Sequence, residues 1–208
     1  MSEAKLDLCK LHKDEYVAPK KPQLVKTGPG KYLAVVGRGR PGDELFQAQI
    51  GSLYGVAYTM KFQSMAAGQD YKVATLEGLY WPDDPAACVF GQTLEALNWK
   101  LLIRTPDFIT AKQLKEAVAA LAEKGKAPQA GDVKLERLNE GLCVQMLHVG
   151  PYAAEKPTVD AMTAFMKEQG LAPNGPHHEI YLSDPRRVPE DRLKTILRIP
   201  VRKSPATV

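Results

Sequence analysis

The chain has 208 residues, of which 44% are hydrophobic and 25% charged, and its formal net charge is +4. These values are typical of a folded globular protein and exclude a disordered or fibrous chain. Basic residues are scattered, with Lys20–Lys21 and Arg186–Arg187 as the densest pairs, so no basic stripe is available to follow a phosphate backbone. We therefore expect no direct nucleic-acid partner.

The cysteines indicate a reducing compartment. Cys9, Cys88 and Cys143 are odd in number, widely spaced and without a CxxC pair, which argues against a disulfide framework and against a structural zinc. The sequence also lacks an apolar signal segment and a run of 18 apolar residues. We expect a soluble, cytoplasmic protein with no membrane partner.

The beginning of the chain differs in pattern from the rest. Residues 1–30 are polar, with prolines and isolated hydrophobic residues, and predict an extended arm that straps onto the body. From residue 31, apolar residues recur with strand or helix periods. In chain order we predict a strand at Lys31–Gly37, a helix at Asp43–Lys61, strands at Tyr71–Leu76 and Trp99–Arg104, a helix at Thr110–Lys124, a hairpin from Val133–Leu138 to Leu142–Val149, a helix at Pro157–Gln169, and strands at His177–Leu182 and Leu193–Val201.

Turn and capping residues mark the ends of these elements. Trp81–Pro85 is rich in turn residues. Thr110 and Gln113 have the spacing of a capping box, and Asp43 is placed as an N-cap. Gly125 stands where the helix after Thr110 should end.

Two parts of the chain resemble each other. KLLIRTP at 100–106 aligns with KTILRIP at 194–200, and the strand–glycine–helix pattern near residue 36 recurs near residue 147. Two copies of a strand–helix–strand–strand unit explain both matches. We expect one domain over 31–202, with repeat one at 31–106, a linking helix and hairpin at 107–141, repeat two at 142–202, and a tail at 203–208.

This repeat predicts an α+β fold. Each unit alone would leave one face of a small sheet uncovered, so the two should share an antiparallel sheet. We expect the helices on one face of that sheet and a ligand cleft on the other.

One strand near the C-terminus has an apolar face and a face with polar, potentially catalytic side chains. With a period of two, Ile180 and Leu182 face one way, while His177, Glu179 and Tyr181 face the other. A solvated sheet face would carry such residues too. The supply of aromatic residues favours a binding site: Tyr80 and Trp81 belong to the equivalent element of the first copy, and Tyr152 begins the second helix. A pseudo-twofold axis would bring them around Glu179.

Other interpretations have less support. The run GRGRPG at 37–42 matches a dinucleotide fingerprint, but no acidic residue follows at the end of a second strand. His177 and Glu179 could share an ion, yet the sequence offers no clear third ligand. We expect no metal and no cofactor. Tyrosine and phenylalanine residues on the helices (Tyr54, Tyr58, Phe62 and Phe165) are expected in the core.

Five stretches together resemble the GyrI-like small-molecule-binding family. They are EGLYW at 77–81, WKLLIRTPDFIT at 99–110, VQMLHVGPY at 144–152, HHEIYLSDPRR at 177–187 and LKTILRIPV at 193–201. The resemblance runs from about residue 22 to residue 202. It implies the tandem strand–helix–strand–strand fold found in effector-binding domains of multidrug-responsive regulators.

The resemblance also implies functional residues. In that family a glutamate in an aromatic cleft receives lipophilic, often cationic ligands, and the matching residue is Glu179. Some stand-alone members are similar to hydrolases that open the cyclopropane ring of DNA-alkylating compounds. By motif, the aromatic cage would draw on Tyr80, Trp81, Tyr152 and Tyr181, with Trp99 a further candidate.

Two functions are therefore expected from this site. The first is hydrolysis of strained electrophiles, in which Glu179 acts on water and Tyr181 donates a hydrogen bond to the developing oxyanion, or the reverse. His177 would contribute to ligand binding. The second is a binding module that sequesters or senses lipophilic cations without chemistry. The partner is a small aromatic or lipophilic molecule, and the chain is a monomer or a homodimer.

Overall fold

A computed structural model describes residues 5–83 and 97–204 of the chain. The predicted turn segment is thus described only as far as Asp83, and Cys88 lies outside the described residues. Cys9 and Cys143 are free thiols. Within the described residues, no helix is both long and apolar enough to cross a membrane.

The chain forms a mixed α+β fold, as predicted. The helices are α1 (Leu8–Leu11), α2 (Lys13–Tyr16), α3 (Glu44–Ala66), α4 (Ala111–Glu123) and α5 (Lys156–Glu168), with short 3-10 turns at Ala130–Asp132, Tyr152–Ala154 and Glu190–Arg192. The strands are β1 (Gln23–Lys26), β2 (Gly30–Gly39), β3 (Leu76–Pro82), β4 (Leu97–Thr105), β5 (Lys134–Leu138), β6 (Leu142–Val149), β7 (Leu171–Pro173), β8 (His177–Tyr181) and β9 (Lys194–Lys203).

The helix signals in the sequence are confirmed. Thr110 and Gln113 form the complete capping box of α4, and the Asp43 side chain accepts a hydrogen bond from the Phe46 N–H at the start of α3. Gly125 follows α4 with φ of 60°, a left-handed conformation that glycine adopts without strain.

The sheet is symmetric about its central pair of strands. Its order is β1-β6-β9-β8-β3-β4-β2-β5, with β7 added to β9, and the ladders are antiparallel. The runs β2-α3-β3-β4 and β6-α5-β8-β9 therefore occupy mirrored positions in this order. Their third elements, β3 and β8, pair directly, with Gly78 opposite Glu179. The two halves of the chain thus meet at the strand predicted to carry the chemistry.

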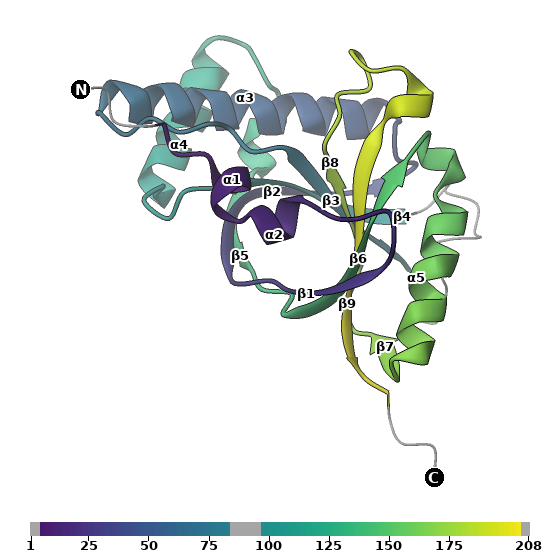
Figure 1. The fold of residues 1–208 in the computed structure, drawn as a ribbon. Coiled ribbons are helices and arrows are strands. Elements are labelled where there is room, and N and C mark those ends of the chain that lie inside the picture. The colour runs from purple at the N-terminus through teal and green to yellow at the C-terminus, as the bar shows by residue number, and fades with distance from the viewer. Residues whose placement is uncertain (1–4, 84–96, 205–208) are drawn as a thin grey trace.

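The expected hairpin between residues 133 and 149 is wrong. Strands β5 and β6 exist, but β5 pairs with β2 and β6 pairs with β1 and β9. Only residues 139–141 separate these two strands, and three residues span about 10 Å when extended. The sheet must therefore curl until its two ends approach each other, as Figure 1 shows.

The predicted strand at Tyr71–Leu76 is also wrong, because the ladder begins at Leu76 and continues to Pro82. Residue Tyr71 instead makes a single bridge to Leu6 of the arm, and its ring is buried against Phe108. Packing of this irregular segment in the core, rather than ladder pairing, accounts for its apolar residues.

All three long helices cover one face of the sheet (Figure 1). Helices α3 and α4 pack over β2 and β4, where Leu33, Leu101 and Ile103 are fully buried. Helix α5 packs over β6 and β9 through a second cluster that includes Met162 and Leu197. The uncovered part of this face lies between the two groups of helices.

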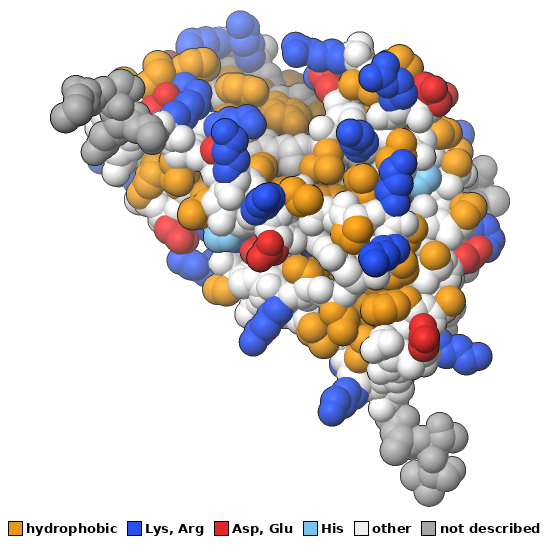
Figure 2. All heavy atoms as spheres, in the orientation of Figure 1, with side chains coloured by type: hydrophobic (Ala, Val, Ile, Leu, Met, Phe, Trp, Pro, Cys, Tyr) orange, Lys and Arg blue, Asp and Glu red, His pale blue; other side chains and the backbone are white. Residues whose placement is uncertain are grey.

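The arm covers the opposite face. Tyr16 and Ala18 pack against Ile180 and Ile196, on the inner side of the curled sheet (Figure 1). The expectation that this face carries the ligand cleft is therefore wrong, because two short helices of the arm fill it. Figure 2 shows one outer face of the molecule, on which Lys and Arg side chains are interspersed with hydrophobic ones.

A buried network of charges joins the arm to the sheet. His178 lies between Glu77 and Glu140, with nitrogen–oxygen distances of 3.0 Å to each. Glu140 also accepts from Arg198 at 3.1 Å, and Tyr16 of the arm donates to Glu77 at 2.6 Å. The short crossing at residues 139–141 thus brings Glu140 within hydrogen-bond distance of His178 and Arg198.

Replacement of Glu140 should destabilise the fold. Glu140→Gln removes the carboxylate that pairs with the buried charges of His178 and Arg198. Loss of one partner from a buried ion pair lowers the free energy of unfolding by about 3 kcal/mol. Urea unfolding measures this change. Glu136→Gln removes a carboxylate from a partly exposed pair with Lys100 and is the control, with an expected cost below about 1 kcal/mol. Equal costs for the two variants would contradict the importance of this network.

Candidate functional site

Strand β8 places its side chains alternately, as predicted. His178 and Ile180 face the arm, while His177, Glu179 and Tyr181 face the side of the helices. The register sets Gly78 of β3 opposite Glu179. An added Cβ at Gly78 would come within 2.7 Å of the Tyr80 hydroxyl oxygen, so the glycine leaves room for that ring to lie beside the carboxylate.

A cleft of about 830 Å³ opens above these residues, between α3 and the start of α5. This volume is in the range of small-molecule sites. Its lining includes Phe46, Ile50 and Tyr54 on α3, Tyr80 on β3, Glu179 and Tyr181 on β8, and Tyr152 and Glu155 before α5. Both halves of the chain thus contribute to one cleft.

Three tyrosines form a contiguous part of the lining. The hydroxyl oxygens of Tyr80 and Tyr181 are 2.5 Å apart, which is a short hydrogen bond. Tyr152 meets Tyr181 edge to face, with ring centroids 5.7 Å apart. Burial, together with the charge of Glu179, raises the pKa of Tyr80 and Tyr181 well above 10 and that of Tyr152 to about 12. All three phenols therefore keep their protons and can donate hydrogen bonds.

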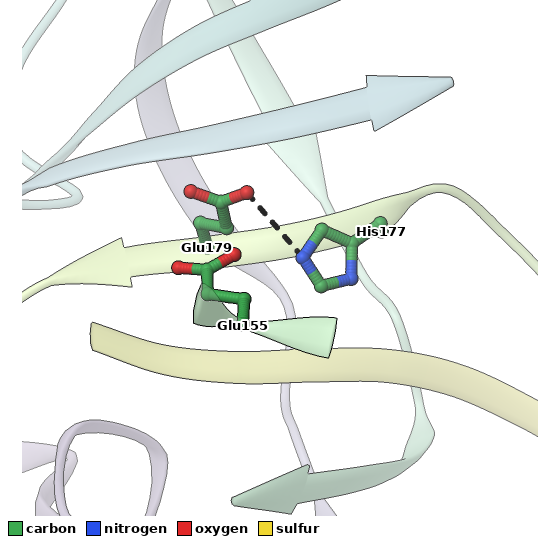
Figure 3. Close-up of side chains that lie close together, drawn as sticks. All are labelled: Glu155, His177 and Glu179. Carbon is green, nitrogen blue, oxygen red and sulfur yellow. Dashed lines mark ion pairs between the residues drawn. The ribbon is translucent and has the colours of Figure 1, made fainter. Parts of the chain in front are cut away.

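Two carboxyl groups of the cleft lining lie close to an imidazole that is buried beneath the cleft. Glu155, His177 and Glu179 each bring one ligand-type atom within 4.8 Å of the others (Figure 3). His177 Nε2 is 3.4 Å from Glu179 Oε1. Burial, and then the charge of Glu179, raises the pKa of Glu155 to about 10. In this structure Glu155 therefore holds a proton at neutral pH.

Glu155 is the residue that sequence analysis missed. It is 3% exposed and directly precedes α5, where an acidic residue is normally explained by the helix dipole. The sequence did offer one signal for Glu155: it follows Tyr152 by three residues, and this spacing places both side chains at the N-terminal end of α5.

Two predicted cage residues do not line the cleft. Trp81 follows Tyr80 on β3 and so faces the opposite side of the sheet, where it packs with Tyr32 and Leu102. Trp99 is fully buried beneath α3, donates its indole N–H to Gln49 at 2.7 Å, and meets Phe46 edge to face. Neither ring is among the described residues that line the cleft, so the structure does not bring these two predicted residues to the site.

The helix aromatics also differ from expectation. Tyr54 lines the cleft, and Tyr58 and Phe62 on the next turns of α3 are half exposed. Tyr54 and Phe165 both pack against core clusters, as predicted. His177 is buried under the cleft, in contact with Glu179, and does not belong to the lining.

Comparisons with known proteins agree with this architecture. The model of the GyrI-like small molecule binding domain matches residues 104–202. An uncharacterized conserved protein from Listeria innocua is 38% identical, with a TM-score of 0.87, over 95% of this chain and all of that chain. A hydrolase from the same organism is 36% identical, with a TM-score of 0.85, over 96% of this chain and all of that chain.

More distant structures share the fold alone. The C-terminal domain of EcmrR is 11% identical, with a TM-score of 0.56, over 88% of this chain and 98% of that chain. Among curated proteins, no sequence matches this chain.

The geometry predicts which tyrosines bind flat aromatic compounds. Tyr152→Ala should weaken binding of a planar fluorescent dye about threefold to tenfold, because an aromatic contact contributes about 0.5–1.5 kcal/mol. Tyr58→Ala removes a similarly exposed tyrosine outside the cleft lining and should leave the affinity unchanged. Fluorescence titration measures both. A larger loss in the Tyr58 variant would contradict the assignment of the cleft.

Proposed function

This chain belongs to the GyrI-like small-molecule-binding family, and we propose that its cleft binds lipophilic aromatic xenobiotics in the cytoplasm and hydrolyses strained electrophiles among them. The observation that carries the proposal is a carboxylate, Glu179, enclosed with three tyrosines in a cleft of about 830 Å³. Compounds with a cyclopropane ring conjugated to a dienone are the substrate class that fits this chemistry.

The walls suit flat aromatic substrates. Tyr152 and Tyr181 lie nearly perpendicular, at 85°, so a planar ring can stack on one and meet the edge of the other. Phe46 and Ile50 on α3 supply an apolar wall opposite β8. Holding the substrate in one orientation would supply much of the rate.

Ring opening requires a water molecule and a proton acceptor. The oxygen of water bonds to a ring carbon as a carbon–carbon bond breaks, and the electron pair of that bond makes the dienone aromatic. Its carbonyl oxygen becomes a phenol by taking up a proton, so the product is the substrate plus one water. Glu179 positions this water and accepts its proton, as a general base does.

The tyrosine pair stabilises the negative charge that grows on the carbonyl oxygen. Tyr80 and Tyr181 share one hydrogen bond, and Tyr181 is also hydrogen-bonded to Glu179, so a substrate carbonyl would take the place of Glu179 as the acceptor of this proton. A donor placed at a developing oxyanion typically contributes 100-fold to 1000-fold in rate, on the order of 3–4 kcal/mol. The pKa of both phenols, well above 10, keeps this proton in place.

The likeness to proteins described as hydrolases supports an enzymatic function. A second function remains open, in which the cleft only binds and sequesters lipophilic cations. The observation that favours it is the same pairing of a carboxylate with aromatic faces, since a cation can be held by Glu179 and by cation–π contacts.

Replacement of Glu179 tests the enzymatic proposal. The protein is incubated with a cyclopropane-bearing alkylating compound, and water addition is followed by mass spectrometry. Glu179→Gln should lower the rate about 100-fold to 10,000-fold, the usual contribution of a general base, while leaving the fold intact. Glu168→Gln, on the exposed side of α5, is the control with unchanged turnover. Recovery of unchanged compound from a tight complex with native protein would exclude hydrolysis and favour the binding function.

Replacement of Tyr181 tests the role of the hydroxyl pair separately. Tyr181→Phe keeps the ring but removes the hydrogen bond to Tyr80, so turnover should fall about 100-fold with little change in substrate affinity. Steady-state kinetics distinguish kcat from KM. A rise in KM at constant kcat would show that Tyr181 only binds the substrate.

A further inference from the structure

Glu155, Glu179 and the buried His177 beneath the cleft have the spacing of metal ligands. His177 Nε2 and Glu179 Oε1 are 3.4 Å apart. Charge-assisted hydrogen bonds are shorter, at about 2.7–2.9 Å. Two ligands that each lie about 2.0–2.1 Å from a tetrahedral zinc ion are about 3.4 Å apart. The observed separation is thus that of two ligands of one ion.

The third group supplies an independent observation. Glu155 is only 3% exposed. Within the described residues, its buried Oε1 atom has no hydrogen-bond partner. Figure 3 shows its carboxyl group directed toward Glu179 and His177. A buried carboxyl oxygen without a partner costs free energy, and a cation between the three groups would remove that cost.

We propose that Glu155, His177 and Glu179 bind a divalent transition-metal ion, with zinc or manganese as the best fits. One imidazole and two carboxylates form a mixed nitrogen and oxygen set, which suits these ions better than calcium, whose sites use oxygen alone. Closing the largest ligand separation, 4.8 Å or less, needs only small rotations of the glutamate side chains.

Three protein ligands leave a coordination position open toward the cleft, because Glu155 and Glu179 both line it. This arrangement is that of catalytic rather than structural zinc sites. Ion binding itself does not depend on the hydrolytic function proposed above. A catalytic role of the ion does rest on the proposed hydrolysis: a bound ion would lower the pKa of a water molecule at the bottom of the cleft.

Metal titration of the full chain tests the site. Zinc is titrated into metal-free protein by calorimetry, and cobalt binding is followed by visible absorption as a second readout. We expect one equivalent of zinc with a Kd in the micromolar range or tighter. Glu155→Gln and His177→Gln should each weaken binding at least tenfold. His12→Gln is the matched control, because His12 lies 3.7 Å from one carboxylate, Glu15, outside the cleft, and its loss should change nothing.

Two results would overturn the ion site. Native protein that binds no zinc above the level of the Glu155 variant contradicts it, and so does a Glu155 variant that binds as tightly as native protein. The proposals on metal and on hydrolysis fail separately. The Tyr181→Phe variant should still bind one equivalent of zinc but lose turnover. Native protein that hydrolyses its substrate without binding zinc would contradict the ion site and leave the proposed hydrolysis intact.

Discussion

The site depends on a buried ion pair network on the other side of its strand. Burial opposes a charge on His178, but Glu140 and then Glu77 outweigh that effect and raise the pKa of His178 to about 9. The protonated imidazole therefore joins β8, which carries it, to β3 through Glu77 and to the crossing segment through Glu140. This clamp fixes the register in which Gly78 faces Glu179, and hence the side of the sheet on which the acid appears.

Alternation along β8 separates two environments. The network facing the arm is satisfied by ion pairs and hydrogen bonds, with Arg198 and Tyr16 completing it. The helix side carries acidic groups in an aromatic cleft, where Glu155 Oε1 lacks a partner within the described residues. Polar groups that are satisfied stabilise a fold, whereas a buried group without a partner is a common feature of functional sites. The unpartnered carboxyl oxygen of Glu155 thus lies on the helix side of the sheet, where the cleft allows a ligand to reach it.

Local patterns in the sequence predicted much of this. The capping box of Thr110, the glycine end of α4 and the alternation of His177, Glu179 and Tyr181 are set within a few residues, and all three are confirmed. The family followed from motifs between residues 77 and 201, and the α+β class followed from the repeated strand–helix–strand–strand unit. These features need no knowledge of distant contacts.

The errors arose where distant segments decide the outcome. The strand order places β5 and β6 near opposite edges of the sheet, which no local turn signal reveals. Trp81 was assigned to the cleft because the start of β3 was placed too early, so the alternation was not carried through Tyr80. Glu155 has the sequence pattern of an ordinary helix start, and only the packing of α5 on β6 brings it to Glu179.

A crystal structure with a flat aromatic compound bound is the most direct test of this account. We expect the compound to lie between α3 and the start of α5, with its ring against Tyr152 and Tyr181 and its polar group within hydrogen-bond distance of Glu179 or Tyr80. A compound bound on the face of Trp81, with the cleft above Glu179 holding only water, would contradict it.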